Sequence, residues 1–166
     1  MLHPAVYLSE NDVIHGKGLM VKTAISKGEI ISQLDPSQPV LYITDILEMP
    51  AEQQEEILRY GYQFSEDQLV IEKEPERYMN HSCDANTVWL ERDTMIAARD
   101  IAAGEELTYD YATTELSIPF QFDCQCGSSA CRHQVTNLDY LIPAWQKKYG
   151  DFLPPHTLRA IARTQP

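Results

Sequence analysis

Three cysteines lie within eight residues of one another in the second half of the chain, at Cys124, Cys126 and Cys131. Thiolates with this spacing, on a loop that a glycine allows to bend, can converge on one cation, and tetrahedral zinc then needs a fourth ligand. The candidates are Cys83, the one cysteine that remains, and His133, two residues after Cys131. The spacing therefore predicts a zinc site, and the alternative is a set of unpaired thiols.

The cellular compartment determines whether cysteines form disulfides or stay reduced. Residues 1–5 carry neither a basic segment nor an apolar one, so they do not predict a secretory signal. The sequence also holds no apolar run near the roughly 18–20 residues that a membrane helix needs. We therefore expect no membrane association and an intracellular, soluble protein, in the cytoplasm or the nucleus, whose cysteines are reduced or bound to metal.

The charge of the chain is strongly acidic: 13 Lys and Arg against 25 Asp and Glu give a net charge of −12. This balance disfavours direct nucleic-acid binding, which depends on clustered Lys and Arg. It favours a basic partner, such as a peptide rich in Lys and Arg. The alternative is that the acidity serves solubility alone.

Short strands dominate the first two thirds of the chain, which has 166 residues and fits one domain. The hydrophobic pattern predicts strands at residues 6–8, 18–24, 30–34, 68–72, 87–91 and 94–98. It predicts helices at residues 50–60, 143–149 and 156–163, with proline near the start of each. The fold class is therefore mostly β with peripheral helices (α+β). Residues 25–29 and 101–105 are alike and predict one tight turn used twice.

Three polar segments carry side chains that suit a site. Gly16-Lys17-Gly18 precedes a predicted strand and would let a backbone approach a ligand, although a plain turn explains it as well. Residues 77–86 are dense in hydrogen-bonding side chains around Asn80-His81, and the alternative is a surface loop. Glu106 to Tyr111 places two tyrosines at positions i and i+2, on one face of a strand unless the chain turns near Asp110.

Together these segments resemble the SET-domain protein lysine methyltransferases in order and separation. The segment Asn80-His81-Ser82-Cys83 carries most of the resemblance, and residues 124–132 resemble the post-SET module of that family. Residues 145–152 resemble the tail of small stand-alone microbial SET proteins. The resemblance covers residues 3–150. It implies a SET domain at 3–113, a post-SET zinc-binding module at 120–136 and a C-terminal helical tail at 137–166.

The family fold consists of small curved sheets, a β-clip, around a pseudoknot. The resemblance therefore implies that the Asn80-His81 segment lies beside the Tyr109-Asp110-Tyr111 segment. Two departures from the family pattern stand near the site: Ala85 replaces a usual proline, and His133 replaces a usual glycine.

The resemblance also implies a cofactor and a metal. S-adenosylmethionine, the methyl donor, would lie against these residues: Gly16, Lys17, Gly18, Arg77, Tyr78, Asn80 and His81. One structural zinc per chain would be held by Cys83, Cys124, Cys126 and Cys131.

Three tyrosines match the catalytic positions of the family. Tyr111 matches the catalytic tyrosine, Tyr62 resembles a second channel tyrosine, and Tyr109 stands where tyrosine or phenylalanine sets the number of methyl groups added. The function implied is methyl transfer to the side-chain amine of a lysine in a basic, histone-like protein or peptide, with mono- or dimethyl-lysine as product. The alternatives are a catalytically silent SET module that binds peptides or partners, and a zinc-dependent interaction module without a cofactor. The sequence specifies no oligomeric state.

Overall fold

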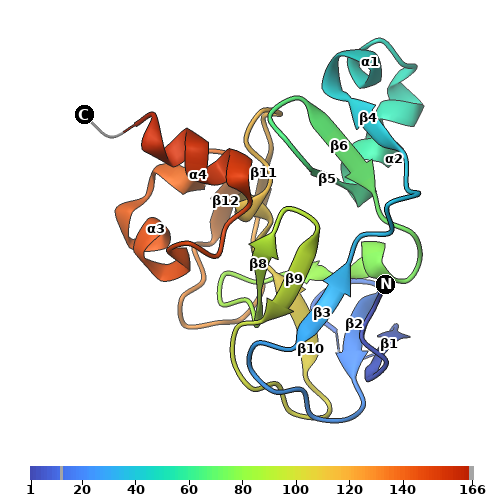
Figure 1. The fold of residues 1–166 in the computed structure, drawn as a ribbon, viewed down its shortest axis with the longest axis vertical. Helices are drawn as coiled ribbons and strands as arrows, with labels where there is room; N and C mark the ends of the chain where they lie inside the picture. The colour runs from blue at the N-terminus through green and yellow to red at the C-terminus, as the bar shows by residue number, and fades with distance from the viewer. Residues whose placement is uncertain (12, 165–166) are drawn as a thin grey trace.

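The computed structural model describes residues 1–11 and 13–164, and within them the strands form four small sheets (Figure 1). The largest has the order β1-β2-β10-β7, with bounds Val6–Ser9, Gly18–Val21, Glu106–Tyr109 and Asn80–His81. A second has the order β3-β9-β8, with bounds Ile30–Gln33, Thr94–Ala97 and Thr87–Glu91. A third has the order β4-β6-β5, with bounds Val40–Tyr42, Gln68–Ile71 and Gly61–Gln63. The hairpin β11-β12 covers Gln121–Asp123 and Gln134–Thr136.

The helices lie at the two ends of this β-rich body (Figure 1). Helices α1 (Ile43–Leu47) and α2 (Ala51–Tyr60) stand beside the β4-β6-β5 sheet. Helices α3 (Pro143–Tyr149) and α4 (Pro155–Ala162) stand near the β11-β12 hairpin. Short 3₁₀ turns cover Glu76–Tyr78, Tyr111–Thr113 and Asp139–Leu141. The fold class expected from the sequence, mostly β with peripheral helices, is confirmed.

The elements expected from periodicity are present with shifted ends. The predicted strand at 18–24 ends at Val21, and the predicted helix at 50–60 begins at Ala51, with Pro50 as its N-terminal capping position. Proline lacks the backbone N–H but has the φ that a first turn requires, so it fits just outside or just inside a helix start. Strands β4 and β5 and helix α1 were not predicted, because three to five residues are too few to display a period.

The two similar segments at 25–29 and 101–105 form the same turn and also pair with each other. Gly28 and Gly104 have φ values of 85° and 86°, a region that L side chains rarely adopt. Ile25 and Ile101 exchange two backbone hydrogen bonds of 2.9 Å in an isolated antiparallel bridge. The repeated sequence therefore marks two similar turns, one after β2 and one before β10, and their pairing holds these ends of the two strands together.

Strand β7 pairs in parallel with β10, with Asn80 opposite Thr108 and His81 opposite Tyr109. A parallel pair needs a long crossover between its strands. Here the intervening chain includes the β8-β9 hairpin. This pairing brings the segment that contains Asn80-His81 beside the segment that ends at Tyr111, which confirms the adjacency expected from the resemblance.

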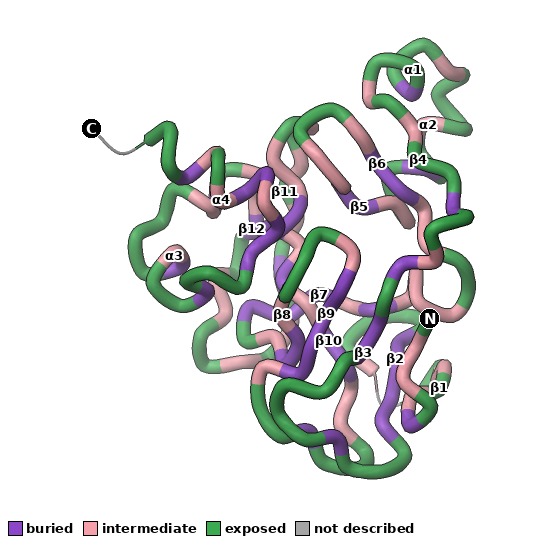
Figure 2. Tube along the Cα trace, in the orientation of Figure 1, coloured by how far each residue is buried: buried purple, intermediate pink, exposed green. Residues whose placement is uncertain are grey.

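The interior of the described structure consists of three clusters of buried side chains. Figure 2 marks the buried residues along the chain in purple. The main cluster lies among β2, β3, β9 and β10 and includes the fully buried Leu19, Ile31 and Leu107. A second cluster packs Trp145 and Tyr149 of α3 against the cysteine region. Each fully buried Leu or Ile contributes about 1.5–3 kcal/mol to folding. The second cluster therefore anchors the C-terminal helices to the segment around Cys83.

Among the residues that the structure describes, no helix combines the length and the apolar character required to cross a bilayer.

Candidate active site and metal centre

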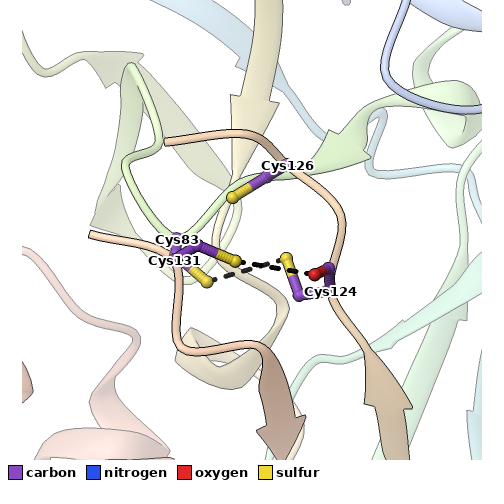
Figure 3. Close-up of side chains that lie close together, drawn as sticks. All are labelled: Cys83, Cys124, Cys126 and Cys131. Carbon is purple, nitrogen blue, oxygen red and sulfur yellow. Dashed lines mark hydrogen bonds between the residues drawn. The ribbon is translucent and has the colours of Figure 1, made fainter. Parts of the chain in front are cut away.

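The four cysteine side chains converge on one point (Figure 3). Their Sγ atoms all lie within 4.8 Å of one another, and Cys83 Sγ is 3.7 Å from Cys124 Sγ. Four sulfurs at a tetrahedral Zn–S distance of about 2.3 Å are separated by about 3.8 Å. Burial raises the pKa of the Cys83 thiol to about 11, so a cation is what would hold it as a thiolate. The donor set and its spacing fit structural zinc.

The hairpin β11-β12 explains how these cysteines meet. Cys124 follows β11, Cys126 and Cys131 lie in the loop before β12, and Cys83 arrives from the segment after β7. His133 is exposed and lies outside the group of four within the described part of the chain, although its backbone N–H donates to Cys131 Sγ at 3.4 Å. The structure therefore brings Cys83, rather than His133, to the fourth corner.

His133 has a φ of 61°, in the left-handed region. A residue with a Cβ atom is strained there, whereas glycine is not. The histidine thus occupies the position where the family pattern has glycine, and the backbone keeps the conformation that suits glycine.

Three cavities meet at Tyr111, which is the one residue shared by the linings of all three in the described structure. The first, of about 260 Å³, lies between the end of α2 and the segment at 115–122. The second, of about 350 Å³, lies between residues 14–15 and the cysteine hairpin. The third, of about 150 Å³, lies beside Lys17, Arg77 and Tyr78. Ligands in two different cavities could therefore both approach the ring of Tyr111.

The residues expected to hold the cofactor gather around the second and third cavities. Lys17, Arg77 and Tyr78 line the third, His81 lines the second, and Asn80 lines both. Gly16 and Gly18 line neither cavity. Gly16 has a φ of 55°, and a Cβ atom on Gly18 would overlap the Glu106 carboxylate and the Val13 side chain.

The Asn80 side chain fixes the loop that carries these glycines. Its Nδ2 donates to the carbonyl oxygens of His15 and Lys17, both at 3.0 Å, and contacts Glu106 Oε1 at 2.7 Å. Glu106 Oε2 in turn accepts from the Ile14 N–H at 2.7 Å. These hydrogen bonds hold the loop against β10. The polar walls and the close backbone approach fit a ligand with amino and carboxylate groups, such as S-adenosylmethionine.

His81 connects the cysteine group with Tyr111. Its Nδ1 accepts a hydrogen bond from the Tyr111 N–H at 3.2 Å, so the proton of the neutral ring is on Nε2, which points at Cys83 Sγ over 3.3 Å. Burial lowers the pKa of His81 to about 4, although Asp110 opposes the shift, so the ring is neutral at pH 7. The ring of Phe122, from β11, packs edge-on against His81 at 5.2 Å and also lines the first two cavities. Phe122 carried no sequence signal, because one aromatic residue in a three-residue strand is ordinary.

Tyr62, Tyr109 and Tyr111 all line the first cavity. The ring centres of Tyr109 and Tyr111 are 4.8 Å apart. Tyr62 is connected to these two tyrosines through Trp89, whose ring centre lies 5.1 Å from that of Tyr62. Burial raises the pKa of all three phenols above their usual value, so they are neutral hydrogen-bonding groups. The Tyr111 hydroxyl donates to the Met79 carbonyl oxygen at 3.0 Å. The hydroxyls of Tyr62 and Tyr109 have no partner within residues 1–11 and 13–164.

Asp110, which lies between Tyr109 and Tyr111, is a buried carboxylate that the sequence did not single out as a functional residue. Its oxygens accept hydrogen bonds from four residues: Arg132 (2.7 and 2.8 Å), Trp145 (2.9 Å), Tyr149 (2.8 Å) and the Ala112 N–H (3.2 Å). Burial opposes its ionisation, but Arg132 outweighs this effect and holds the pKa of Asp110 below its usual value. One carboxylate thus joins the tyrosine segment to the cysteine hairpin and to α3.

Comparison with known proteins gives one family match, to the SET domain, over residues 16–112. Histone-lysine N-methyltransferase trr of Drosophila melanogaster is 31% identical over 137 residues, which cover 76% of this chain and 6% of that protein. Histone-lysine N-methyltransferase 2B of Homo sapiens is 30% identical over 132 residues, or 72% of this chain and 5% of that protein. Histone-lysine N-methyltransferase ASHR3 of Arabidopsis thaliana is 43% identical over 63 residues, or 34% of this chain and 12% of that protein.

The chain therefore spans only a small part of the length of these relatives. The family match contains Lys17, Asn80 and Tyr111, whereas residues 14–15 and 115–126, which also line the cavities, lie outside it. The cysteine hairpin at 121–136 lies beyond the end of that match.

Proposed function

This chain belongs to the SET-domain family, and we propose that it transfers methyl groups from S-adenosylmethionine to the side-chain amine of a lysine in a basic, histone-like protein or peptide. The observation that carries the proposal is the position of Tyr111, where the first cavity meets the second and third. A donor on one side and a lysine on the other would both reach this ring. The three relatives are all named histone-lysine N-methyltransferases, which supports lysine as the acceptor.

S-adenosylmethionine, when bound, supplies a methyl group carried on a positively charged sulfur. The residues that would hold it are the seven expected from the sequence: Gly16, Lys17, Gly18, Arg77, Tyr78, Asn80 and His81. The Asn80 amide would keep the glycine loop in place, because it already binds the carbonyls of His15 and Lys17. A neutral His81 would offer an uncharged ring surface.

The lysine must present a neutral amine. A free lysine has a pKa near 10.4, so its neutral form costs about 4.6 kcal/mol at pH 7. A dry cavity disfavours the ammonium form and reduces that cost. The tyrosine phenols are neutral, so they would orient the amine by hydrogen bonding rather than act as strong bases. Alignment of the reacting atoms then supplies much of the rate enhancement.

The cysteine group belongs to this proposal as a structural zinc site. Cys83, Cys124, Cys126 and Cys131 would hold the ion, and the hairpin at 120–136 would form a post-SET module beside the SET domain at 3–113. The tail at 137–166, of which residues 165–166 lie outside the described part, would brace this module through Trp145 and Tyr149.

Tyr109 supports mono- or dimethyl-lysine as the product. Tyr109 lines the first cavity and its hydroxyl has no protein partner among the described residues, so this hydroxyl can hold a water molecule or the amine itself. A retained water would occupy the space that a further methyl group needs.

Incubation of the protein with labelled S-adenosylmethionine and either histones or whole-cell lysate, followed by mass spectrometry, tests the proposal. We expect donor-dependent label on lysine. Binding of S-adenosylmethionine without transfer would indicate the silent SET module instead. The absence of both binding and transfer would indicate a zinc-dependent interaction module.

A further inference from the structure

The first cavity contains more charge than a channel for one lysine requires. Besides the three tyrosines, its lining includes the carboxylates of Glu72, Glu76 and Glu115 and the guanidinium groups of Arg59 and Arg77. The carboxylates come from both sides, since Glu72 follows β6 and Glu115 follows the 3₁₀ turn Tyr111–Thr113.

Glu72 is the carboxylate without a partner. It accepts no hydrogen bond and makes no ion pair with any residue in the ranges 1–11 and 13–164, and it lines the first cavity as a partly buried side chain. Burial, with a smaller contribution from Glu76, raises the pKa of Glu72 to about 7. A carboxylate that is partly withdrawn from water and has no protein partner is stabilised when a donor or a cation meets it.

The other charged groups of this cavity have contacts of their own, although the buried Arg77 Nε has no hydrogen-bond partner within the described residues. The Arg77 guanidinium lies 4.4 Å from the ring centre of Tyr60 and pairs with Glu74 at 3.4 Å. Glu76 lies 3.6 Å from the N-terminal amino group. Glu115 accepts hydrogen bonds from the Gln63 N–H at 2.9 Å and from the Thr114 hydroxyl at 3.2 Å. Arg59 lies over the ring of Tyr60, at 5.5 Å.

We propose that Glu72 binds a second cationic side chain of the substrate, so that the preferred target is a lysine with an arginine or another lysine close to it in the sequence. This inference rests on the proposed function, because it takes the first cavity as the place where the target lysine enters.

The target amine itself is the poorer partner for Glu72. It must lose its positive charge before it reacts, and the tyrosine hydroxyls suffice to orient it. A flanking arginine keeps its charge throughout, because its pKa exceeds 12, and its planar donors match a carboxylate. A lysine at the flanking position would serve less well, as a single point charge.

Peptides with one target lysine test the inference. Each peptide has arginine one or two residues before or after the lysine. Its partner peptide has glutamine at the same position instead. Dissociation constants are measured by fluorescence anisotropy with the wild-type protein, Glu72→Gln and Glu52→Gln. Glu52, at the exposed start of α2, is the matched control because its change removes the same charge outside the cavity.

We expect at least one arginine peptide to bind the wild-type protein about tenfold more tightly than its glutamine partner, a difference of about 1.4 kcal/mol. Glu72→Gln should reduce this preference below about twofold and Glu52→Gln should retain it, in line with the loss of one charge-assisted hydrogen bond. An equal preference in wild type and Glu72→Gln overturns the inference.

A wild-type protein that gains less than twofold from arginine at every position also overturns it, and this measurement needs no variant to fold. The assay separates the two proposals, because it measures binding. A preference that depends on Glu72, in a protein that transfers no methyl group to any of these peptides, would support the Glu72 site while contradicting the proposed enzyme.

Discussion

The guanidinium group of Arg132 binds the carboxylate of Asp110 through two hydrogen bonds, of 2.7 and 2.8 Å. Arg132 directly follows Cys131, and Asp110 directly precedes Tyr111. The Arg132 Nε–H also donates a hydrogen bond to Asp139 at 2.7 Å. The ion pair thus ties the cysteine hairpin to the tyrosine that the three cavities share.

Replacing Arg132 should cost much more than replacing an arginine in a similar but exposed pair. Loss of one partner leaves a buried charge without compensation, so we expect Arg132→Met to lower the free energy of unfolding by about 3 kcal/mol or more. Arg159 binds Glu66 with bonds of 2.6 and 2.9 Å, but both side chains are about half exposed. Arg159→Met should therefore cost about 1 kcal/mol or less.

Urea unfolding of the two variants provides the measurement, with the metal content of each determined in parallel. Equal losses in the two variants would contradict the view that burial makes the Asp110 pair decisive. A loss in Arg132→Met that occurs only when metal is missing would assign the effect to the cysteine hairpin instead.

The protein, purified without added metal, should contain one zinc per chain. The convergence of four sulfurs is the physical reason, since thiolates are preferred zinc ligands. Cys83→Ser should lower the zinc content and the stability together, because metal binding and folding are coupled. His133→Ala is the matched control and should retain the zinc. A metal content near zero with two disulfides, or full retention of zinc in Cys83→Ser, would count against the site.

The local features of this fold could be predicted from the sequence. The turns at 25–29 and 101–105 each need glycine at a positive φ, and each was marked by Gly followed by Glu. The glutamate side chains accept from the Ser26 and Ala102 N–H groups, both at 2.7 Å, and close the two turns in the same way. Such signals are local, because the residues that interact are three apart.

The long-range arrangement could not be derived from periodicity. Strand β7 has only two residues, and its position beside the segment that ends at Tyr111 became an expectation only through the resemblance to a known family, which did not specify the parallel pairing with β10. The sequence indicates Asp110 only as a position near which the chain can turn. Its role depends on Arg132, Trp145 and Tyr149, which are 22 to 39 residues away. No hydrophobic period reports which polar partner a buried carboxylate will meet.

Glu115→Gln should stabilise the protein at pH 8 and have little effect at pH 5. Burial raises the pKa of Glu115 to about 7, and the free carboxyl titrates near 4.5. The native state therefore binds the proton more tightly, so this group's stabilising contribution is complete below pH 4.5 and is lost as the pH rises through 7. Glutamine is neutral throughout and can still accept from the Gln63 N–H. The gain at pH 8 should reach about 2 to 3 kcal/mol.

Thermal or urea unfolding of wild type and Glu115→Gln at both pH values measures this difference. Glu72 titrates in the same range in both proteins, so the comparison isolates Glu115. A variant that is equally stabilised or equally destabilised at pH 5 and pH 8 would show that Glu115 does not titrate as proposed.

Tyr111→Phe should abolish most methyl transfer while the fold remains intact. The change removes one hydroxyl and its hydrogen bond to the Met79 carbonyl, a loss of about 1 kcal/mol of stability. Loss of alignment should lower kcat/KM about 100-fold or more. Tyr42→Phe, at an exposed tyrosine of β4, is the matched control and should be unaffected. Near-normal rates in Tyr111→Phe would remove this residue from the mechanism.

The last prediction concerns the number of methyl groups added. Tyr109 lines the first cavity, its ring centre lies 4.8 Å from that of Tyr111, and none of the described residues hydrogen-bonds to its hydroxyl. A water held there would occupy the space of a growing methylamine and would point the lone pair of the amine away from further attack. Displacing an ordered water with a methyl group that cannot replace its hydrogen bonds is unfavourable. The wild-type protein should therefore stop at mono- or dimethyl-lysine.

Tyr109→Phe removes that hydroxyl and leaves the ring in place. The first methyl transfer should change little, while the product at long reaction times should shift toward trimethyl-lysine. Mass spectrometry of one lysine peptide after equal numbers of turnovers measures the distribution, with Tyr42→Phe as the control for loss of a hydroxyl outside the cavity. Trimethyl-lysine as the main product of the wild type would show that Tyr109 does not limit methylation. An unchanged distribution in Tyr109→Phe would leave the residue as a packed aromatic at the end of β10.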